Sequence, residues 1–173
     1  KAMSGDKAPF ILKEELKQEM DSWKFPLNFI DFETSTVPLP FFAGQKPYEH
    51  VAFQFSHHIY HEDGTIEHAN EFISSEAGVY PNFLFARALM EALSKNNGSV
   101  FKFATHENTI VNAIIEQLIQ SKEADKDELI VFLKSISHSK RNTIQEAWEG
   151  ERDMICLLYT SDAADDMQGV DLG

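Results

Sequence analysis

Apolar residues recur along the chain with two different periods. A period of three to four residues, with polar residues between, is typical of helices that bury one side. It predicts helices over residues 10–23 and 81–93, a helix after Thr105 that carries apolar residues from Ile110 to Ile119, a helix after Asp125 that carries apolar residues from Leu129 to Ile136, and a further helix over 138–155. Alternating or nearly continuous apolar runs predict strands over residues 27–33, 51–62, 65–73 and 99–104.

Residues typical of turns and helix caps lie between these segments. Asp63-Gly64 lies between two strand-like runs and predicts a β-hairpin. Pro81 suits the first turn of a helix, and Thr105 suits a helix cap. Asp125 and Glu128 have the spacing of a capping box. The order of elements predicts an α/β fold in which an antiparallel hairpin is followed by strand–helix units of a mixed sheet.

Two acids interrupt the first predicted strand. Asp31 and Glu33 are two residues apart, so both side chains lie on one face of the strand. The apolar neighbours indicate a central strand covered on both faces, where two carboxylates are costly unless a cation neutralises them. Mg²⁺ and Mn²⁺ prefer such ligands, so the pair predicts a metal site. The alternative is that the acids face solvent on an edge strand.

Glu107 is the candidate for a third carboxylate. It lies in the first turn of a predicted helix, directly after a strand, which is where sites gather in α/β sheets. Its position is also favoured by the helix dipole in any protein. His106 and Asn108 flank it and either bind substrate or form polar surface.

The proline-rich loop over residues 34–50 carries aromatic side chains directly after the acidic strand. Phe41 and Phe42 could stack on an unpaired base or could cap the core, and the sequence favours neither. Three histidines, His57, His58 and His61, are close enough in the sequence to suggest a metal cluster, but the geometry of a strand argues against one. Neighbours on a strand point to opposite faces, and His57 and His61 lie about 13 Å apart along it, so we expect core-edge and surface positions.

Chain length, net charge and cysteine content limit the kinds of protein that this sequence can be. The 173 residues suffice for one domain, and no apolar run approaches the roughly 20 residues of a membrane span. The net charge of -13 argues against a general nucleic-acid-binding surface, although metal-bound acids contribute to such a count. Cys156 is the single cysteine, which excludes an internal disulfide and fits a cytoplasmic protein.

Several segments, in this order, carry a family resemblance. They are FIDFET, PFFAGQKPYEHVAFQFSHHI and FATHENTIVNAI. The acidic strand, the proline-rich loop, the G-x-x-P-Y step at 44–48 and the F-Q-F-S strand at 53–56 resemble the uncharacterised bacterial domain-of-unknown-function family 2779, over roughly residues 25–155.

That family in turn resembles ribonuclease H-like exonucleases with a D-x-E…D…D acid set. The resemblance implies a 3′–5′ exonuclease acting on DNA or RNA with two Mg²⁺ or Mn²⁺ ions. By it, Asp31 bridges both ions, Glu33 binds the ion that activates water, and Glu107 replaces the second-motif aspartate. The implied substrate contacts are Thr34, Phe41, Phe42, His106 and Asn108. The third motif has no match, so we expect this chain to be inactive alone.

The sequence predicts three regions: an amphipathic lead-in at 1–24, the nuclease-like domain at 25–155 and a tail at 156–173. The tail begins CLLYTSDAADD, which resembles translated sequencing-adapter read-through, with a genuine variable tail as the alternative. A different functional class is also open, namely a non-catalytic nucleic-acid-binding or scaffolding module on the same fold. A glutamate at the second motif favours it mildly. The sequence does not distinguish DNA from RNA.

Overall fold

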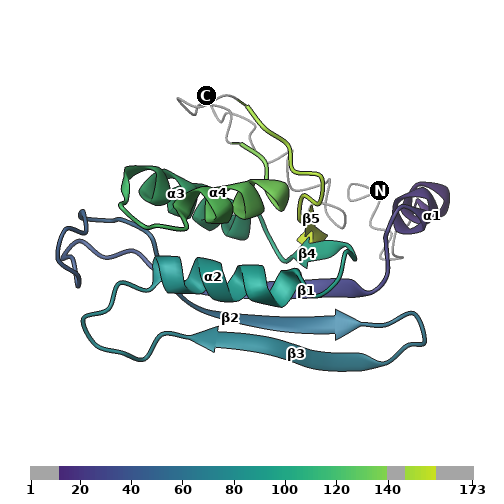
Figure 1. Cartoon of the computed structure of the whole chain (residues 1–173). Helices are drawn as coiled ribbons and strands as arrows, with labels where there is room; N and C mark the ends of the chain where they lie inside the picture. The colour runs from purple at the N-terminus through teal and green to yellow at the C-terminus, as the bar shows by residue number, and fades with distance from the viewer. Residues whose placement is uncertain (1–11, 140–146, 159–173) are drawn as a thin grey trace, which may run out of the picture.

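A computed structural model describes residues 12–139 and 147–158. Figure 1 shows a mixed sheet with helices packed against it. The helices are α1 (Lys13–Asp21), α2 (Asn82–Leu93), α3 (His106–Gln120) and α4 (Lys126–Ser135). The strands are β1 (Leu27–Ser35), β2 (Val51–Tyr60), β3 (Ile66–Ile73), β4 (Val100–Lys102) and β5 (Ile155–Cys156).

The five strands lie in the order β3-β2-β1-β4-β5. β1 is antiparallel to β2, and β2 is antiparallel to β3, as the hairpin signal at Asp63-Gly64 predicts. β1 is parallel to β4, and β4 is parallel to β5. The α/β fold with a mixed sheet is therefore confirmed, and the acidic strand β1 lies at its centre.

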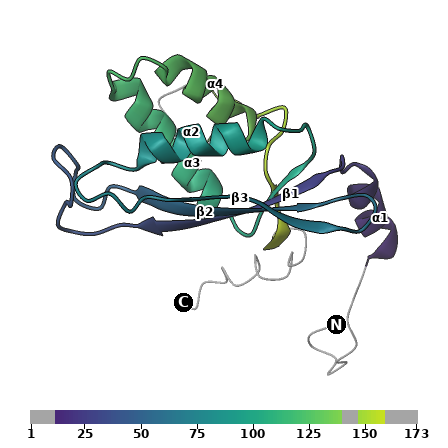
Figure 2. The same ribbon diagram turned by 60° about the horizontal axis from the view of Figure 1, so that its bottom comes forward.

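One face of the sheet carries the core. Ile30 and Phe32 of β1 and Phe55 of β2 belong to one buried cluster with residues of α2, α3 and α4. Phe85 of α2 is fully buried and contacts the rings of Phe32, Phe55 and Phe72 edge-on. Figure 2 shows α2 and α4 on the same side of the sheet.

The described residues cover the opposite face at one end only. Trp23, which follows α1, packs edge-on against Phe101, and Phe101 stacks on Phe29. Beyond Phe29, the next β1 residues on this face, Asp31 and Glu33, are exposed. The expectation that β1 is covered on both faces is therefore wrong along this stretch of the described chain. We call this surface, with Asp31, Glu33, Ser56 and Glu71, the open face.

Two local expectations are also wrong. Neither Thr105 nor Asp125 caps a helix through its side chain. The carboxylate of Asp125 instead accepts two hydrogen bonds from Arg87, at 2.6 and 2.7 Å, because a charge-assisted pair competes well against a cap. The described part of 138–155 is not helical: His138 bridges Glu149, and β5 begins at Ile155.

The predicted boundary between domain and tail falls inside β5. Cys156, the first residue of the predicted tail, pairs with Lys102 of β4. The predicted lead-in helix is present as α1, while residues 1–11 and 159–173 lie outside the described ranges.

A buried histidine anchors the helix-covered face of β2. His57 has no exposed surface, and its two ring nitrogens meet Asn28 Oδ1 at 3.0 Å and Asn70 Nδ2 at 3.1 Å. A neutral ring satisfies both, with Nε2–H donating to Asn28 and Nδ1 accepting from Asn70. Burial, together with the positive charges of Lys95 and Arg152 and the neighbouring His58, lowers the pKa of His57 to about 4.

This shift predicts an acid-sensitive fold. The pKa of His57 is lower when folded than the unfolded value of 6.5, so the unfolded chain binds more protons between these values. The contribution is complete above pH 6.5 and is lost as the pH falls towards 4, by roughly 3 kcal/mol in total. Urea unfolding from pH 7 to 4 measures it. His57→Gln should flatten this dependence, while His68→Gln, an exposed histidine on β3, should leave it unchanged; equal slopes in all three proteins would contradict the assignment.

Candidate functional site

The acidic pair lies at the centre of the open face. Asp31 and Glu33 alternate with the buried Ile30 and Phe32, so both carboxylates project away from the helices. Neither carboxylate has a hydrogen bond or ion pair to another described residue. Two unpaired acids on one face leave their oxygens available to an external cation.

A β-bulge lies directly beside Glu33. Glu33 pairs with Gln54, but the next residue, Thr34, pairs with Ala52, so Phe53 is an extra residue on β2. A bulge re-aims side chains, and such features often lie beside functional sites. Here it accompanies a hollow that begins at Ser35, on the same face as Glu33.

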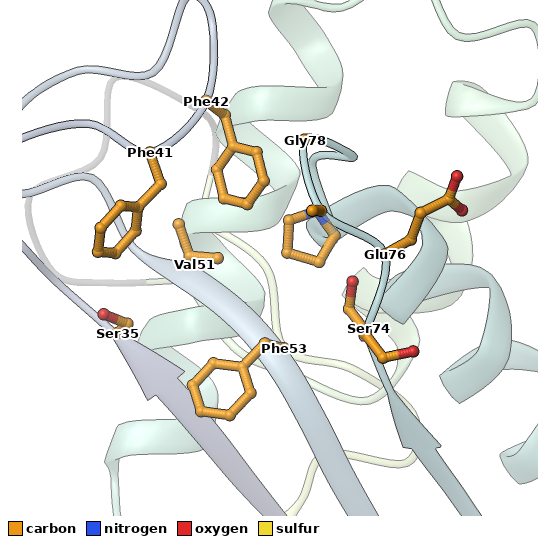
Figure 3. A pocket seen from close by; sticks show the side chains of 11 residues that line it. Ser35, Phe41, Phe42, Val51, Phe53, Ser74, Glu76 and Gly78 are labelled. Atoms are coloured by element: carbon orange, nitrogen blue, oxygen red, sulfur yellow. The ribbon is translucent and has the colours of Figure 1, made fainter.

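Figure 3 shows this hollow from close by. Its volume is about 440 Å³, and we call it the phenylalanine hollow. The rings of Phe41, Phe42 and Phe53 surround Val51, and Pro81 also lines the hollow. The remaining lining residues are Ser35 and the segment 74–78, with Glu76 as the one charged member. The lining contains no lysine or arginine, so the hollow suits an uncharged planar group better than a phosphate.

The aromatic loop carries one packed ring and one exposed ring, and stacking on a base stays a prediction. Phe42 packs edge-on against Tyr80, with ring centroids 5.5 Å apart, and so helps to anchor the loop. Phe41 is 68% exposed and available to a partner.

The start of α3 meets the end of β1. The hydroxyl of Thr34 lies 2.8 Å from Nε2 of the exposed His106. This contact brings together two of the predicted substrate-binding residues, from segments 72 positions apart.

Glu107 lies at the predicted place but does not join the acidic pair. It is 3% exposed, and its Oε2 is buried without a hydrogen-bond partner among the described residues. No group of three or more His, Cys, Asp or Glu side chains in ranges 12–139 and 147–158 is arranged to hold a metal ion. The donor chemistry of Asp31 and Glu33 fits Mg²⁺ or Mn²⁺, whereas the predicted three-carboxylate cage is not assembled.

Asn108 serves the fold rather than the surface. Its amide oxygen accepts from the backbone N–H of His138 at 3.1 Å, and its amide nitrogen donates to the carbonyl of His138 at 3.1 Å. Asn112, one turn later, donates to the same carbonyl at 3.0 Å. Both ends of the Asn108 amide are therefore used within the fold, and its contact with substrate stays a prediction.

The sequence did not point to one buried charged group, at the end of β4. Lys102 ends β4, is 2% exposed and shares the helix-covered face with Ile30. Burial lowers the pKa of Lys102, while the carboxylates of Asp153 and Glu107 act in the opposite direction. The sequence did contain a signal. Lys102 follows Val100 by two positions, so in a strand both side chains lie on the same face and point into the core.

Asp153 is the other missed residue. Its Oδ2 lies 2.7 Å from Nδ1 of His138, and its Oδ1 is buried without a hydrogen-bond partner among the described residues. It directly precedes the buried Met154 and β5, the parallel partner of β4.

The remaining histidines agree with the expectation. His57 is in the core network, and His58 meets His68 on the open face with ring centroids 4.6 Å apart. His61 lies 3.2 Å from the carboxylate of Glu67. None belongs to a metal-binding group in the described ranges.

Comparison with protein families shows which family the chain belongs to. The sequence matches the family described as "Domain of unknown function (DUF2779)" over residues 28–157. The chain belongs to the DUF2779 family. The DUF2779 match begins at the second residue of β1, includes β2 to β5, and reaches one residue beyond Cys156. Comparison with curated proteins and with solved structures gave no match.

The helices were also compared with the requirements of a membrane span. Within the described ranges, no helix combines the length and the apolar character that crossing a bilayer needs.

Proposed function

We propose that this DUF2779 domain belongs to a divalent-metal-dependent nuclease that hydrolyses phosphodiester bonds of DNA or RNA, as a 3′–5′ exonuclease. The observation that carries the proposal is the pair of unpaired, exposed carboxylates on the central strand, with an aromatic-lined hollow beginning two residues beyond Glu33. The strand order, with β2 antiparallel in an otherwise parallel sheet, supports the ribonuclease H-like resemblance.

In this mechanism Asp31 and Glu33 would hold Mg²⁺ or Mn²⁺ through their exposed carboxylates. When bound, two such ions would activate a water as nucleophile and neutralise charge on the phosphate. The open face admits the phosphodiester to the acids from the side away from the helices. Water attacks phosphorus and one ester P–O bond breaks, which leaves a phosphate monoester and a free hydroxyl. His106, whose Nε2 lies 2.8 Å from the hydroxyl of Thr34 at the end of the acidic strand, would act as a donor to the phosphate.

The phenylalanine hollow predicts a contact with an unpaired base. Stacking of a base on an aromatic ring contributes about 1–3 kcal/mol, so Phe53→Ala should weaken binding of a single-stranded oligonucleotide roughly 5- to 150-fold. Fluorescence anisotropy with a labelled oligonucleotide measures the loss. Phe103→Ala is the control, because Phe103 is 59% exposed and does not line the hollow. Equal affinities for both variants would exclude the hollow as the base site.

A second candidate is a non-catalytic nucleic-acid-binding or scaffolding module. The buried position of Glu107, away from the acidic pair, favours it. Such a module would keep the stacking contact but would not need a metal. Oligonucleotide binding that is the same with EDTA and with Mn²⁺, combined with no cleavage by any family member with the complete acid set, would favour the module.

A further inference from the structure

The strand β3 forms one edge of the sheet in the described part of the chain, and it is the outermost strand in Figure 1. Edge strands often carry lysine or proline, which hinder pairing with a further strand. Residues 66–73 contain neither. The strand begins and ends with large apolar side chains that face solvent, since Ile66 is 73% and Ile73 67% exposed. The edge is therefore suited to pair with another strand.

A β-bulge lies in the middle of β3. Ala69 is an extra residue between His68, which pairs with His58, and Asn70, which pairs with His57. The bulge interrupts the alternation of side chains, so residues on either side of it that are an odd number of positions apart share one face. Four side chains of β3 lie in this way on the open face: Ile66, His68, Glu71 and Ile73.

These four side chains are self-complementary. In an antiparallel copy of β3, the register that places Ile66 opposite Ile73 also places His68 opposite Glu71, and a two-fold axis repeats both contacts. Aliphatic pairs and pairs of opposite polarity stabilise neighbouring strands, whereas like charges directly opposite each other destabilise them. A histidine donates to a carboxylate whether its ring is neutral or charged. Within one chain these two side chains already lie 3.4 Å apart and are both exposed, so they are accessible to a second copy.

The backbone at both ends of β3 is oriented for the same register. The carbonyl of Thr65 accepts from His61, directly after β2, at 2.9 Å, and the N–H of Ser74 donates to β2 at 2.8 Å. Successive residues of a strand direct their backbone groups alternately to the two sides. The N–H and C=O groups of Ile66 and Ile73 therefore point to the free edge, where two residues that face each other can exchange hydrogen bonds.

We propose that a second copy of this chain binds along the β3 edge, antiparallel and in the register that places Ile66 opposite Ile73 and His68 opposite Glu71. The product is a two-fold symmetric dimer with one continuous sheet, in which the open face extends across both copies. The two bulges meet at the axis, so the pairing is the same on either side of it. This inference concerns the edge strand and does not rest on the proposed function.

The first test measures association. The net charge of -13 on each copy opposes dimerisation, so sedimentation velocity is measured at an ionic strength of about 0.15 M, which screens it. The wild-type chain should form a concentration-dependent species of twice its 19.7 kDa mass. Ile73→Lys should weaken the dimer at least about tenfold, because it places a charge opposite Ile66 at two symmetric positions. Val131→Lys, at a site on α4 that is 70% exposed, is the matched control and should leave the dimer unchanged. A wild-type chain that stays monomeric, or equal association of both variants, would overturn the inference.

The second test measures the register. His68→Glu would place two carboxylates opposite each other in its own dimer, and Glu71→Lys would place a lysine opposite His68, so each variant alone should associate more weakly than the wild-type chain. In a mixture of the two variants, one copy of each can pair a glutamate with a lysine and keep one original histidine–glutamate contact. Energy transfer between differently labelled variants should therefore show preferential association in the mixture. Association of the mixture no stronger than that of either variant alone would overturn the register.

Discussion

Asp31→Asn should reduce Mn²⁺-dependent nuclease activity by well over 100-fold in a DUF2779 protein that carries the complete acid set. Asp31 lies on the open face of the central strand with no competing partner in the described chain, so its carboxylate is free to bind the ion. Replacing groups that merely orient metal ligands costs about 10- to 100-fold, and a direct ligand should cost more. The side chains of Asp and Asn have nearly the same shape, so the fold should be retained. Cleavage of a 3′-labelled single-stranded oligonucleotide measures the effect.

Glu71→Gln provides the matched control for Asp31→Asn. Asp31 pairs with Ser56 of β2, and Ser56 pairs with Glu71 of β3. Glu71 is therefore an exposed carboxylate on the same open face, two strands away from Asp31. It should retain nearly full activity. Equal losses for both substitutions would indicate a general effect of charge on the open face, and full activity in Asp31→Asn would refute its role.

Phe85→Ala should destabilise the fold by about 3–5 kcal/mol, the usual cost of removing a buried phenylalanine. Phe85 is fully buried in α2, and its ring contacts the rings of Phe32, Phe55 and Phe72. These contacts tie α2 to β1, β2 and β3, so the cavity would lie directly behind the acidic strand. A small domain has only about 5–15 kcal/mol of stability, so the variant should be largely unfolded in moderate urea. Urea unfolding followed by far-UV circular dichroism measures the loss.

Leu84→Ala tests the same helix at its solvent side. Leu84 is 40% exposed and adjacent to Phe85, so its truncation should cost under about 1 kcal/mol. A similar loss for the two substitutions would show that α2 contributes through its helix alone rather than through the aromatic contacts.

Short-range patterns predict most of the architecture. The hairpin at Asp63-Gly64 and the helices α2 to α4 follow from turn chemistry and hydrophobic period, which depend on nearby residues. The helix caps were predicted wrongly, because Asp125 binds Arg87, which is 38 positions away. Local chemistry cannot show that a stronger partner arrives from another element.

The candidate site could be predicted only in part, because some of its features depend on residues that are far apart in the sequence. The shared face of Asp31 and Glu33 follows from the period of a strand, but the apolar flanks suggested a second cover that the described chain does not supply. Lys102 and Asp153 were missed because the pairing of β4 with β5 joins segments that are far apart in the sequence. Phe53 lines the phenylalanine hollow at a β-bulge, and no glycine or proline near it in the sequence predicts that bulge.

The central claim is that Asp31 and Glu33 bind a divalent ion on the open face. Calorimetric titration of this chain with MnCl₂, compared with Asp31→Asn and Glu71→Gln, tests it most directly. The account predicts saturable binding in the wild-type chain and in Glu71→Gln, and loss of that binding in Asp31→Asn. Binding of equal strength in all three proteins, or no binding in any of them, would contradict it.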